Sequence, residues 1–228
     1  MKLILFDIDG TLLDCGGQAR VAFGQALDTV FGQTGPIDTY DFSGKTDTRI
    51  VTDLMTLAGR PRDEVLTILP RLRDEYLATL DRTLTRDRMR VLPGIEPLLD
   101  HLVARDDVVL ALLTGNWERG ARIKLSRHDL NRYFAFGSFG DDVYDRNDLP
   151  PIAMERALAR TQRRFRPDEV LIVGDSILDV GCARANDIPV LAVATGRTAR
   201  SDLEAAGPTW LVDDLSDAID HAAFQNHR

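Results

Sequence analysis

Asp7 and Asp9 stand where the first apolar run of the chain, Lys2 to Phe6, comes to an end. The run is typical of a buried strand, and side chains at i and i+2 of an extended segment point the same way, so the two carboxylates should share one pocket. Ligands bind at the carboxyl ends of strands in open α/β sheets. Neighbouring carboxylates repel each other unless a cation lies beside them, and Mg²⁺ prefers oxygen ligands. The pair therefore predicts magnesium-dependent chemistry.

Two later apolar runs also end in small or acidic polar residues. The run Val108 to Leu113 precedes Thr114-Gly115-Asn116, and the run Val170 to Val173 precedes a glycine, Asp175 and then Asp179. If the three strands are neighbours in a parallel sheet, their ends form one site. Each motif alone also has a structural interpretation, as turn aspartates or as the cap of a following helix.

Helix and strand patterns alternate from residue 93 to the end of the chain. This alternation predicts an α/β fold, a Rossmann-like parallel sheet with helices on both faces. Between residues 15 and 88 the apolar spacing is helical instead, as in Phe23, Ala26, Leu27 and Val30. We therefore expect a core domain of residues 1–14 and 89–228, with residues 15–88 inserted as an α-helical cap domain.

Taken in order, these motifs resemble those of the haloacid dehalogenase superfamily of phosphohydrolases. The matching pieces are Asp7-Ile8-Asp9-Gly10-Thr11, an apolar strand ending in Thr114, and a late Gly174-Asp175 followed by Asp179. The similarity covers nearly the whole chain and is greatest to the phosphoglycolate phosphatase-like branch, which carries a helical cap. The resemblance implies a magnesium-dependent phosphatase that hydrolyses a small phosphorylated metabolite through an aspartyl-phosphate.

The resemblance also implies a role for each site residue. Asp7 would be the nucleophile, and Asp9 would act first as the acid and then as the base. Mg²⁺ would be held by Asp7, the Asp9 backbone carbonyl and Asp175, with Asp179 in support. The phosphate oxygens would be held by Thr114 and the amides around Gly115, and Asn116 would support that loop or the Asp9 turn.

The chain departs from the family at one cation. A lysine usually precedes the last motif, but here Arg146 lies in that region and no lysine follows Lys124. Arg146 is the expected substitute, because its permanent charge can bind phosphate. Lys124 or Lys45 could supply the charge instead.

Gly44-Lys45-Thr46 invites comparison with a phosphate-binding P-loop. The comparison fails, because Thr39 stands where the first glycine of that motif belongs and no apolar strand precedes the segment. Two interpretations stay open: a solvated loop, or a cap loop in which Lys45 and Arg49 contact the non-reacting part of the substrate.

Composition narrows the possible partners. The 228 residues include 36 acidic and 28 basic ones, a formal net charge of −8, which disfavours a nucleic acid as partner. With only Cys15 and Cys182, a disulfide framework is not expected. The first apolar run is too short for a signal peptide, and no apolar stretch approaches membrane-spanning length. We therefore expect a cytoplasmic protein that does not bind a membrane.

Three alternatives to a phosphatase remain at this stage. A haloacid dehalogenase lacks the acid at the position of Asp9, and a sugar phosphomutase of the β-phosphoglucomutase kind shares all the core motifs. A non-catalytic phosphate-binding relative is the third, with Arg146 as its support. The sequence leaves the identity of the substrate and the oligomeric state open.

Overall fold

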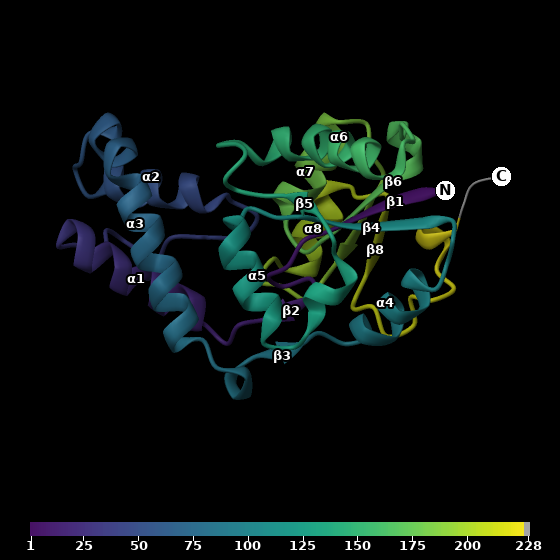
Figure 1. The fold of residues 1–228 in the computed structure, drawn as a ribbon, viewed down its shortest axis with the longest axis horizontal. Helices are drawn as coiled ribbons and strands as arrows, with labels where there is room; N and C mark the ends of the chain where they lie inside the picture. Colours follow the sequence, from purple (N-terminus) through teal and green to yellow (C-terminus); the bar gives the residue numbers. More distant parts are fainter. Residues whose placement is uncertain (226–228) are drawn as a thin grey trace.

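The computed structural model describes residues 1–225, and its main sheet has six parallel strands in the order β5-β4-β1-β6-β7-β8 (Figure 1). In that order the strands are β5 (Gly137–Ser138), β4 (Val108–Leu113), β1 (Lys2–Phe6), β6 (Val170–Gly174), β7 (Val190–Val193) and β8 (Trp210–Val212). Strand β1 lies between β4 and β6, so the three strands that end in the predicted motifs are neighbours. All five residues of β1 are buried, as expected for a central parallel strand.

Helices cover both faces of this sheet. On one face Ile4 and Phe6 pack in a single core with helices α4 (Ile95–Val103) and α5 (Glu118–Ser126). On the other face Leu3 and Leu5 pack in a second core. The helices of that face are α6 (Leu149–Thr161), α7 (Ile177–Ala185) and α8 (Arg200–Ala206). The predicted α/β class, a parallel sheet with helices on both faces, is confirmed.

Helices α1 (Gln18–Phe31), α2 (Asp47–Leu57) and α3 (Arg62–Thr83) lie beyond the carboxyl end of β1 (Figure 1). They pack on one another, for example through Phe23 of α1 and Tyr76 of α3, whose ring centroids are 4.7 Å apart. The helical pattern predicted for this part of the chain is therefore present. Helix α3 runs for 22 residues and continues through Pro70.

A small antiparallel pair joins the two connections between these helices and the sheet. Strand β2 (Leu13–Asp14) pairs with β3 (Arg90–Val91). This pair was not predicted, because strands of two residues carry no periodicity. It places the chain's exit from the sheet region beside its return.

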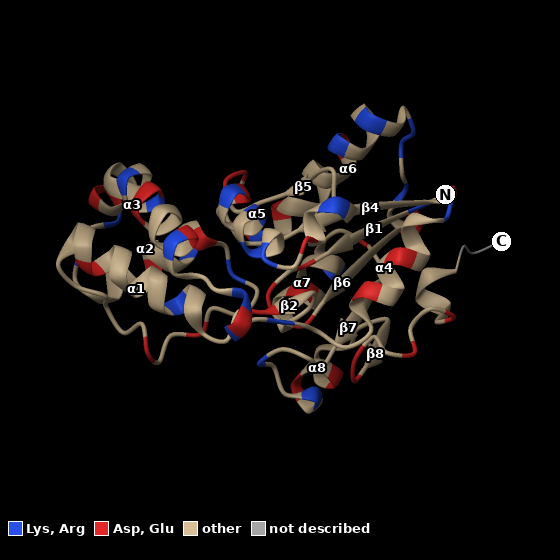
Figure 2. Cartoon of the chain, turned by 60° about the horizontal axis from the view of Figure 1, so that its bottom comes forward, with Lys and Arg blue, Asp and Glu red and all other residues tan. Residues whose placement is uncertain are grey.

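The remaining regular elements are short. They are the 3₁₀ helices η1 (Arg86–Arg88), η2 (Leu130–Tyr133), η3 (Arg146–Asp148), η4 (Pro167–Glu169) and η5 (Ala222–Phe224). Within residues 1–225, no helix combines the length and apolar composition needed to cross a bilayer. Basic and acidic segments meet near β2, at the junction between the helices and the sheet (Figure 2).

Candidate active site

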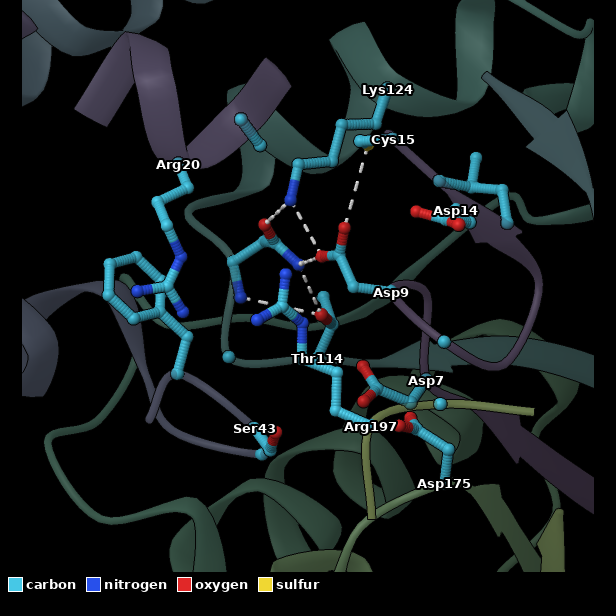
Figure 3. Close-up of a pocket in the computed structure, with 18 of the residues that line it drawn as sticks. Asp7, Asp9, Asp14, Cys15, Arg20, Ser43, Thr114, Lys124, Asp175 and Arg197 are labelled. Atoms are coloured by element: carbon cyan, nitrogen blue, oxygen red, sulfur yellow. Dashed lines mark hydrogen bonds and ion pairs between the residues drawn. The ribbon is translucent and has the colours of Figure 1, made fainter. Parts of the chain in front are cut away.

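Three neighbouring strands deliver polar residues to one cavity at their carboxyl ends. Asp7 follows β1, Thr114 follows β4, and Asp175 follows β6. All three line a cavity of about 600 Å³ (Figure 3). Residues of α1, α2 and α3, the helical segment of residues 15–88, also line this cavity. The close-up shows Asp7 and Asp175 together at one end of the cavity, with Asp9 beside them. The structure therefore brings together the strand-end residues that the sequence singled out.

Asp7, Asp175 and Asp179 form a compact acidic cluster. Each is buried, and each offers a carboxylate oxygen within 4.8 Å of the others. Asp179 is held by its own helix start, because its Oδ2 accepts hydrogen bonds from the Ser176 hydroxyl (2.6 Å) and amide (3.0 Å). Asp175 accepts a hydrogen bond from Thr11 at 3.1 Å on Oδ1. Asp179 is thus positioned to support the cluster from behind, while Asp7 and Asp175 face the cavity.

Two glycines make room for the Asp175 carboxylate. A Cβ atom on Gly10 would lie 2.5 Å from Asp175 Oδ2, and one on Gly196 would lie 1.6 Å from the same atom. Gly10 also has φ of +81°, a conformation that favours glycine. The turn after Asp9 and the loop after β7 therefore close tightly around Asp175.

Arg146, in η3, lies inside the acidic cluster. Its Nη2 is 3.1 Å from Asp7 Oδ2 and 2.5 Å from Asp179 Oδ1, and it also donates to the Leu113 carbonyl at 3.2 Å. Arg146 is only 4% exposed. The cation expected beside Asp7 is thus present, and it comes from the region that the sequence indicated.

The cluster is short of positive charge even with Arg146. Burial raises the pKa of Asp7 to about 6, although the Arg146 charge opposes this. Burial, with the negative charges of Asp179 and Asp7, raises the pKa of Asp175 well above its usual value. When ionised, three carboxylates and one guanidinium carry a net charge of −2. One divalent cation would neutralise that charge, and a set of carboxylate oxygens suits Mg²⁺.

Asp9 has a separate cation. Lys124 on α5 places its Nζ 2.6 Å from Asp9 Oδ2 and 2.6 Å from Asn116 Oδ1, and Asn116 Nδ2 donates to Asp9 Oδ2 at 2.8 Å. Burial alone would raise the pKa of Asp9, but the Lys124 charge and these hydrogen bonds bring it below its usual value. Asp9 is thus held in one orientation as an anion. The expected support of Asp9 by Asn116 is seen in these contacts.

The loop after β4 lines the cavity with Thr114, Gly115 and Asn116. Thr114 is fully buried, and its Oγ1 accepts hydrogen bonds from the Asn116 side chain (2.8 Å) and amide (3.3 Å). A Cβ atom on Gly115 would lie 2.1 Å from the Lys45 carbonyl oxygen. Only a glycine allows this loop to approach the segment before α2 so closely.

Lys45 lines the cavity, but its ammonium group turns to its own segment. It donates to the Asp41 carbonyl and lies 4.6 Å from the centroid of the Tyr40 ring. Arg49, the other residue offered as a possible substrate contact, does not face the cavity. Arg49 is not among the residues lining the cavity, and it pairs with Asp53 at 3.6 Å on the same helix.

Asp47 joins the start of α2 to the sheet region and was not singled out from the sequence. Its carboxylate accepts the Trp117 amide at 2.8 Å, and its own amide donates to the Gly115 carbonyl at 2.8 Å. Burial raises the pKa of Asp47 to about 7, with the Lys124 charge opposing the shift. Its only sequence signal is its place just after Thr46, which caps α2.

Two other residues were missed as functional candidates, Arg20 on α1 and Arg197 after β7. Both line the cavity. Neither lies in a recognisable motif, and each reaches the site only because α1 and the loop after β7 pack near the strand ends. Lys124 was considered only as an alternative cation, because a lysine within a helix gives no sign of which side chains it will meet.

The fold and the site define a class. A family model described as haloacid dehalogenase-like hydrolase matches residues 4–193, so the chain belongs to this family of hydrolases. This confirms the superfamily resemblance drawn from the sequence, and with it the expectation of a hydrolytic enzyme.

Particular relatives can be named within that class. Proteins named phosphoglycolate phosphatase from Synechococcus elongatus and Vibrio vulnificus are each 29% identical to this chain. The first match covers 96% of both chains, and the second covers 96% of this chain and 95% of the relative. A crystal structure of a hydrolase from Pseudomonas syringae is 25% identical, with a TM-score of 0.74 and 97% of each chain covered. These similarities extend over the helical segment as well as the sheet.

Proposed function

We propose that this protein is a magnesium-dependent phosphatase that hydrolyses a small phosphorylated metabolite through an aspartyl-phosphate on Asp7. The observation that carries the proposal is the acidic cluster around Asp7, whose net charge of −2 in the presence of Arg146 matches one divalent cation. The phosphatase names of the relatives support the reaction class, and they make phosphoglycolate the first substrate to test.

In the first half of the reaction, a carboxylate oxygen of Asp7 forms a bond to phosphorus and the ester P–O bond breaks. Asp9 gives its proton to the departing alkoxide. Asp9 is an anion beside Lys124 when no substrate is bound, but the negative charge of an entering phosphate ester competes for Lys124 and raises the pKa of Asp9. Substrate binding therefore favours the protonated acid that this step needs.

In the second half, water attacks the phosphorus of the aspartyl-phosphate and Asp9 takes the proton. The P–O bond to Asp7 breaks, which releases inorganic phosphate and frees the Asp7 carboxylate. The proton stays on Asp9 until phosphate has left and then passes to solvent, which restores the Asp9 anion beside Lys124. Asn116 and Lys124 keep the Asp9 carboxylate in place for both steps. Arg146 stays beside Asp7 throughout and offsets the repulsion between two anions.

Mg²⁺ would be held by the side chains of Asp7 and Asp175 and the backbone carbonyl of Asp9, with Asp179 in support. When bound, it would withdraw charge from the phosphoryl oxygens and so lower the barrier to attack by a carboxylate. The buried Thr114 hydroxyl and the amides around Gly115 are the proposed donors to the remaining phosphate oxygens.

We propose further that residues 15–88 act as a cap over the site and that Lys45 contacts the substrate from it. The cavity is lined from both sides, by strand ends and by residues of α1, α2 and α3. The Asp47 carboxylate accepts a hydrogen bond from the Trp117 amide. The Thr46 hydroxyl donates to the Tyr144 carbonyl, and the Thr48 hydroxyl donates to the Gly140 carbonyl. These contacts hold α2 against the loops at the sheet edge, as a closed cap requires.

The test is phosphate release from a panel of phosphate monoesters, including phosphoglycolate, with Mg²⁺ present and after its removal by a chelator. We expect release only with Mg²⁺, and acid-quenched protein from a radiolabelled substrate should carry phosphate on Asp7. Hydrolysis without a covalent phosphoenzyme, or an unchanged rate after chelation, would contradict the mechanism. Transfer of phosphate between positions of a sugar phosphate, without net release, would indicate the phosphomutase alternative.

A further inference from the structure

The positive charges around the cavity are not all matched by carboxylates. Six basic residues line it: Arg20, Lys45, Arg90, Lys124, Arg146 and Arg197. The ion pairs Arg90–Asp14, Lys124–Asp9 and Arg146–Asp7 account for three of them. Among residues 1–225, the other three form no ion pair with a carboxylate.

Arg20 is held in place by groups that do not neutralise it. Its Nη1 donates to the carbonyls of Ile37 and Tyr40, the latter at 3.0 Å, and its guanidinium lies 4.0 Å from the centroid of the Phe42 ring. Backbone carbonyls and an aromatic face orient the guanidinium but leave its charge in place. Arg20 is therefore a fixed positive group at the cavity wall formed by the helical segment.

Arg197 approaches from the opposite wall. Its loop is anchored in the site, because Thr195 donates to the Gly10 carbonyl at 2.6 Å and Gly196 packs against Asp175. The Arg197 side chain extends from that loop over the cavity (Figure 3). No residue that the structure describes accepts a hydrogen bond from its guanidinium. Arg197 is thus an exposed cation, and its loop is held in place beside the Asp7 end of the cavity.

The positive charges of Arg20 and Arg197 repel each other. Burial lowers the pKa of Arg20, and the positive charge of Arg197 lowers it further, while Asp41 and Asp38 oppose the shift from a distance. Like charges gathered at a cavity repel each other unless an anion lies between them. The start of α1 adds to this field, because its first turn contains no acidic residue and Gly17 and Ala19 line the cavity.

We infer that Arg197 and Arg20 form a subsite for a second anionic group of the substrate, contributed by the sheet edge and the helical segment together. The substrate class is then a phosphate monoester that also bears a carboxylate or a second phosphate. This inference rests on the proposed phosphatase function, since it assumes that the reacting phosphoryl group occupies the Asp7 end of the cavity. Both arginines can bind either anion through paired N–H donors.

The test compares matched substrates. Phosphoglycolate against ethyl phosphate isolates a carboxylate, and fructose 1,6-bisphosphate against fructose 6-phosphate isolates a second phosphate. The wild-type protein should prefer the member with the second anionic group in at least one pair, by about tenfold or more in kcat/KM, since a charge-assisted hydrogen bond contributes ~1.5–3 kcal/mol. The pair that shows the preference identifies the anion. Equal hydrolysis within both pairs would overturn the subsite and leave the phosphatase intact.

Arg197→Gln should then raise KM for the preferred substrate by about 10- to 100-fold with little change in kcat, and leave KM for the counterpart that lacks the second anionic group within about twofold. Folding should be unaffected, because Arg197 is exposed and bonded to no described residue. Arg200→Gln is the matched control: Arg200 begins α8 and pairs with Asp213, away from the cavity. An equal loss on both members of a pair would place Arg197 at the phosphoryl group instead and overturn the inference.

Binding separates this inference from the reaction itself. Calorimetric titration of an Asp7→Asn variant with phosphoglycolate and with ethyl phosphate measures the preference without turnover. Tighter binding of phosphoglycolate than of ethyl phosphate, lost in Asp7→Asn/Arg197→Gln, would support the subsite even if the wild-type protein released no phosphate. Equal binding of the two esters would overturn it.

Discussion

Arg146 and Lys124 are both buried beside carboxylates at the sheet edge, yet they leave their surroundings in different states. Lys124 pairs one to one with Asp9, and Asn116 bonds to both, so the charges of these two side chains cancel. Arg146 lies among three carboxylates and cannot neutralise them. The difference shows where an added cation is needed and where an oriented acid and base is already built.

Substitutions in the two arrangements should therefore change different steps of the reaction. Changes around Arg146 should alter the metal requirement or the formation of the phosphoenzyme. Changes around Lys124 should alter proton transfer by Asp9 and leave the metal requirement as it was.

The largest effect should come from exchanging the two aspartates for their amides. Asp7→Asn should lower turnover by at least about 10³-fold and abolish the phosphoenzyme, because an amide does not attack phosphorus. Its fold should survive, since the amide keeps the shape and removes a buried charge. Asp9→Asn should still form phosphoenzyme from a substrate with a good leaving group but hydrolyse it slowly, as rapid quench would show. Residual turnover of Asp7→Asn near the wild-type rate would contradict the assignment.

Lys124→Met should lower kcat by about 10- to 100-fold, because Asp9 and Asn116 lose the cation that orients them. The Mg²⁺ concentration for half-maximal rate should stay within about twofold of the wild-type value. Arg119→Met, on the exposed side of the same helix, serves as the control and should behave as wild type. A Lys124 variant with normal kcat but a large change in Mg²⁺ requirement would reverse the roles given to the two cations.

Asp175→Asn, unlike Lys124→Met, should change the Mg²⁺ requirement. Its loss removes one carboxylate oxygen from the proposed metal site, so half-maximal rate should require about 10- to 100-fold more Mg²⁺. Excess Mg²⁺ should restore part of the activity. Titrating the rate with Mg²⁺ gives the concentration for half-maximal rate in the wild type, Asp175→Asn and Lys124→Met. If Asp175→Asn kept the wild-type Mg²⁺ curve, the metal would lie elsewhere.

The smallest effect concerns stability at the junction beside Lys124. Asp47 is faced by Lys124, Asp9 and Asp141 and accepts the Trp117 amide; burial raises its pKa from 3.8 to about 7. Because the folded state binds this proton more tightly, the contribution of Asp47 to the free energy of unfolding is lost as pH rises from about 4 to about 7.

Asp47→Asn keeps an oxygen acceptor for the Trp117 amide but does not ionise. Its Tm relative to wild type should therefore rise by about 2–5 °C between about pH 5 and about pH 8. Thermal unfolding followed by circular dichroism at several pH values measures this difference. A constant difference across that range would show that Asp47 ionises normally in the folded protein.

The sequence by itself determined the sheet and the strand ends. Apolar runs such as Val170 to Val173 are local signals, and in a parallel sheet their polar successors must meet at one edge. Asp7, Thr114 and Asp175 could thus be assigned to one site from the sequence alone. The parallel order and the helices on both faces followed from the alternation of helix and strand patterns. The β2–β3 pair did not follow, because two residues per strand leave no pattern.

Only the tertiary structure decided which cation serves which carboxylate. Lys124 and Asp9 are 115 positions apart, and Arg146 reaches Asp7 from a short 3₁₀ turn. The direction of a long basic side chain depends on the packing of the element that carries it, which no local pattern records. For the same reason the sequence did not predict that Arg49 pairs with Asp53, or that Arg197 lines the cavity. Backbone periodicity is written locally in the sequence, whereas charge pairing depends on contacts formed when distant segments pack together.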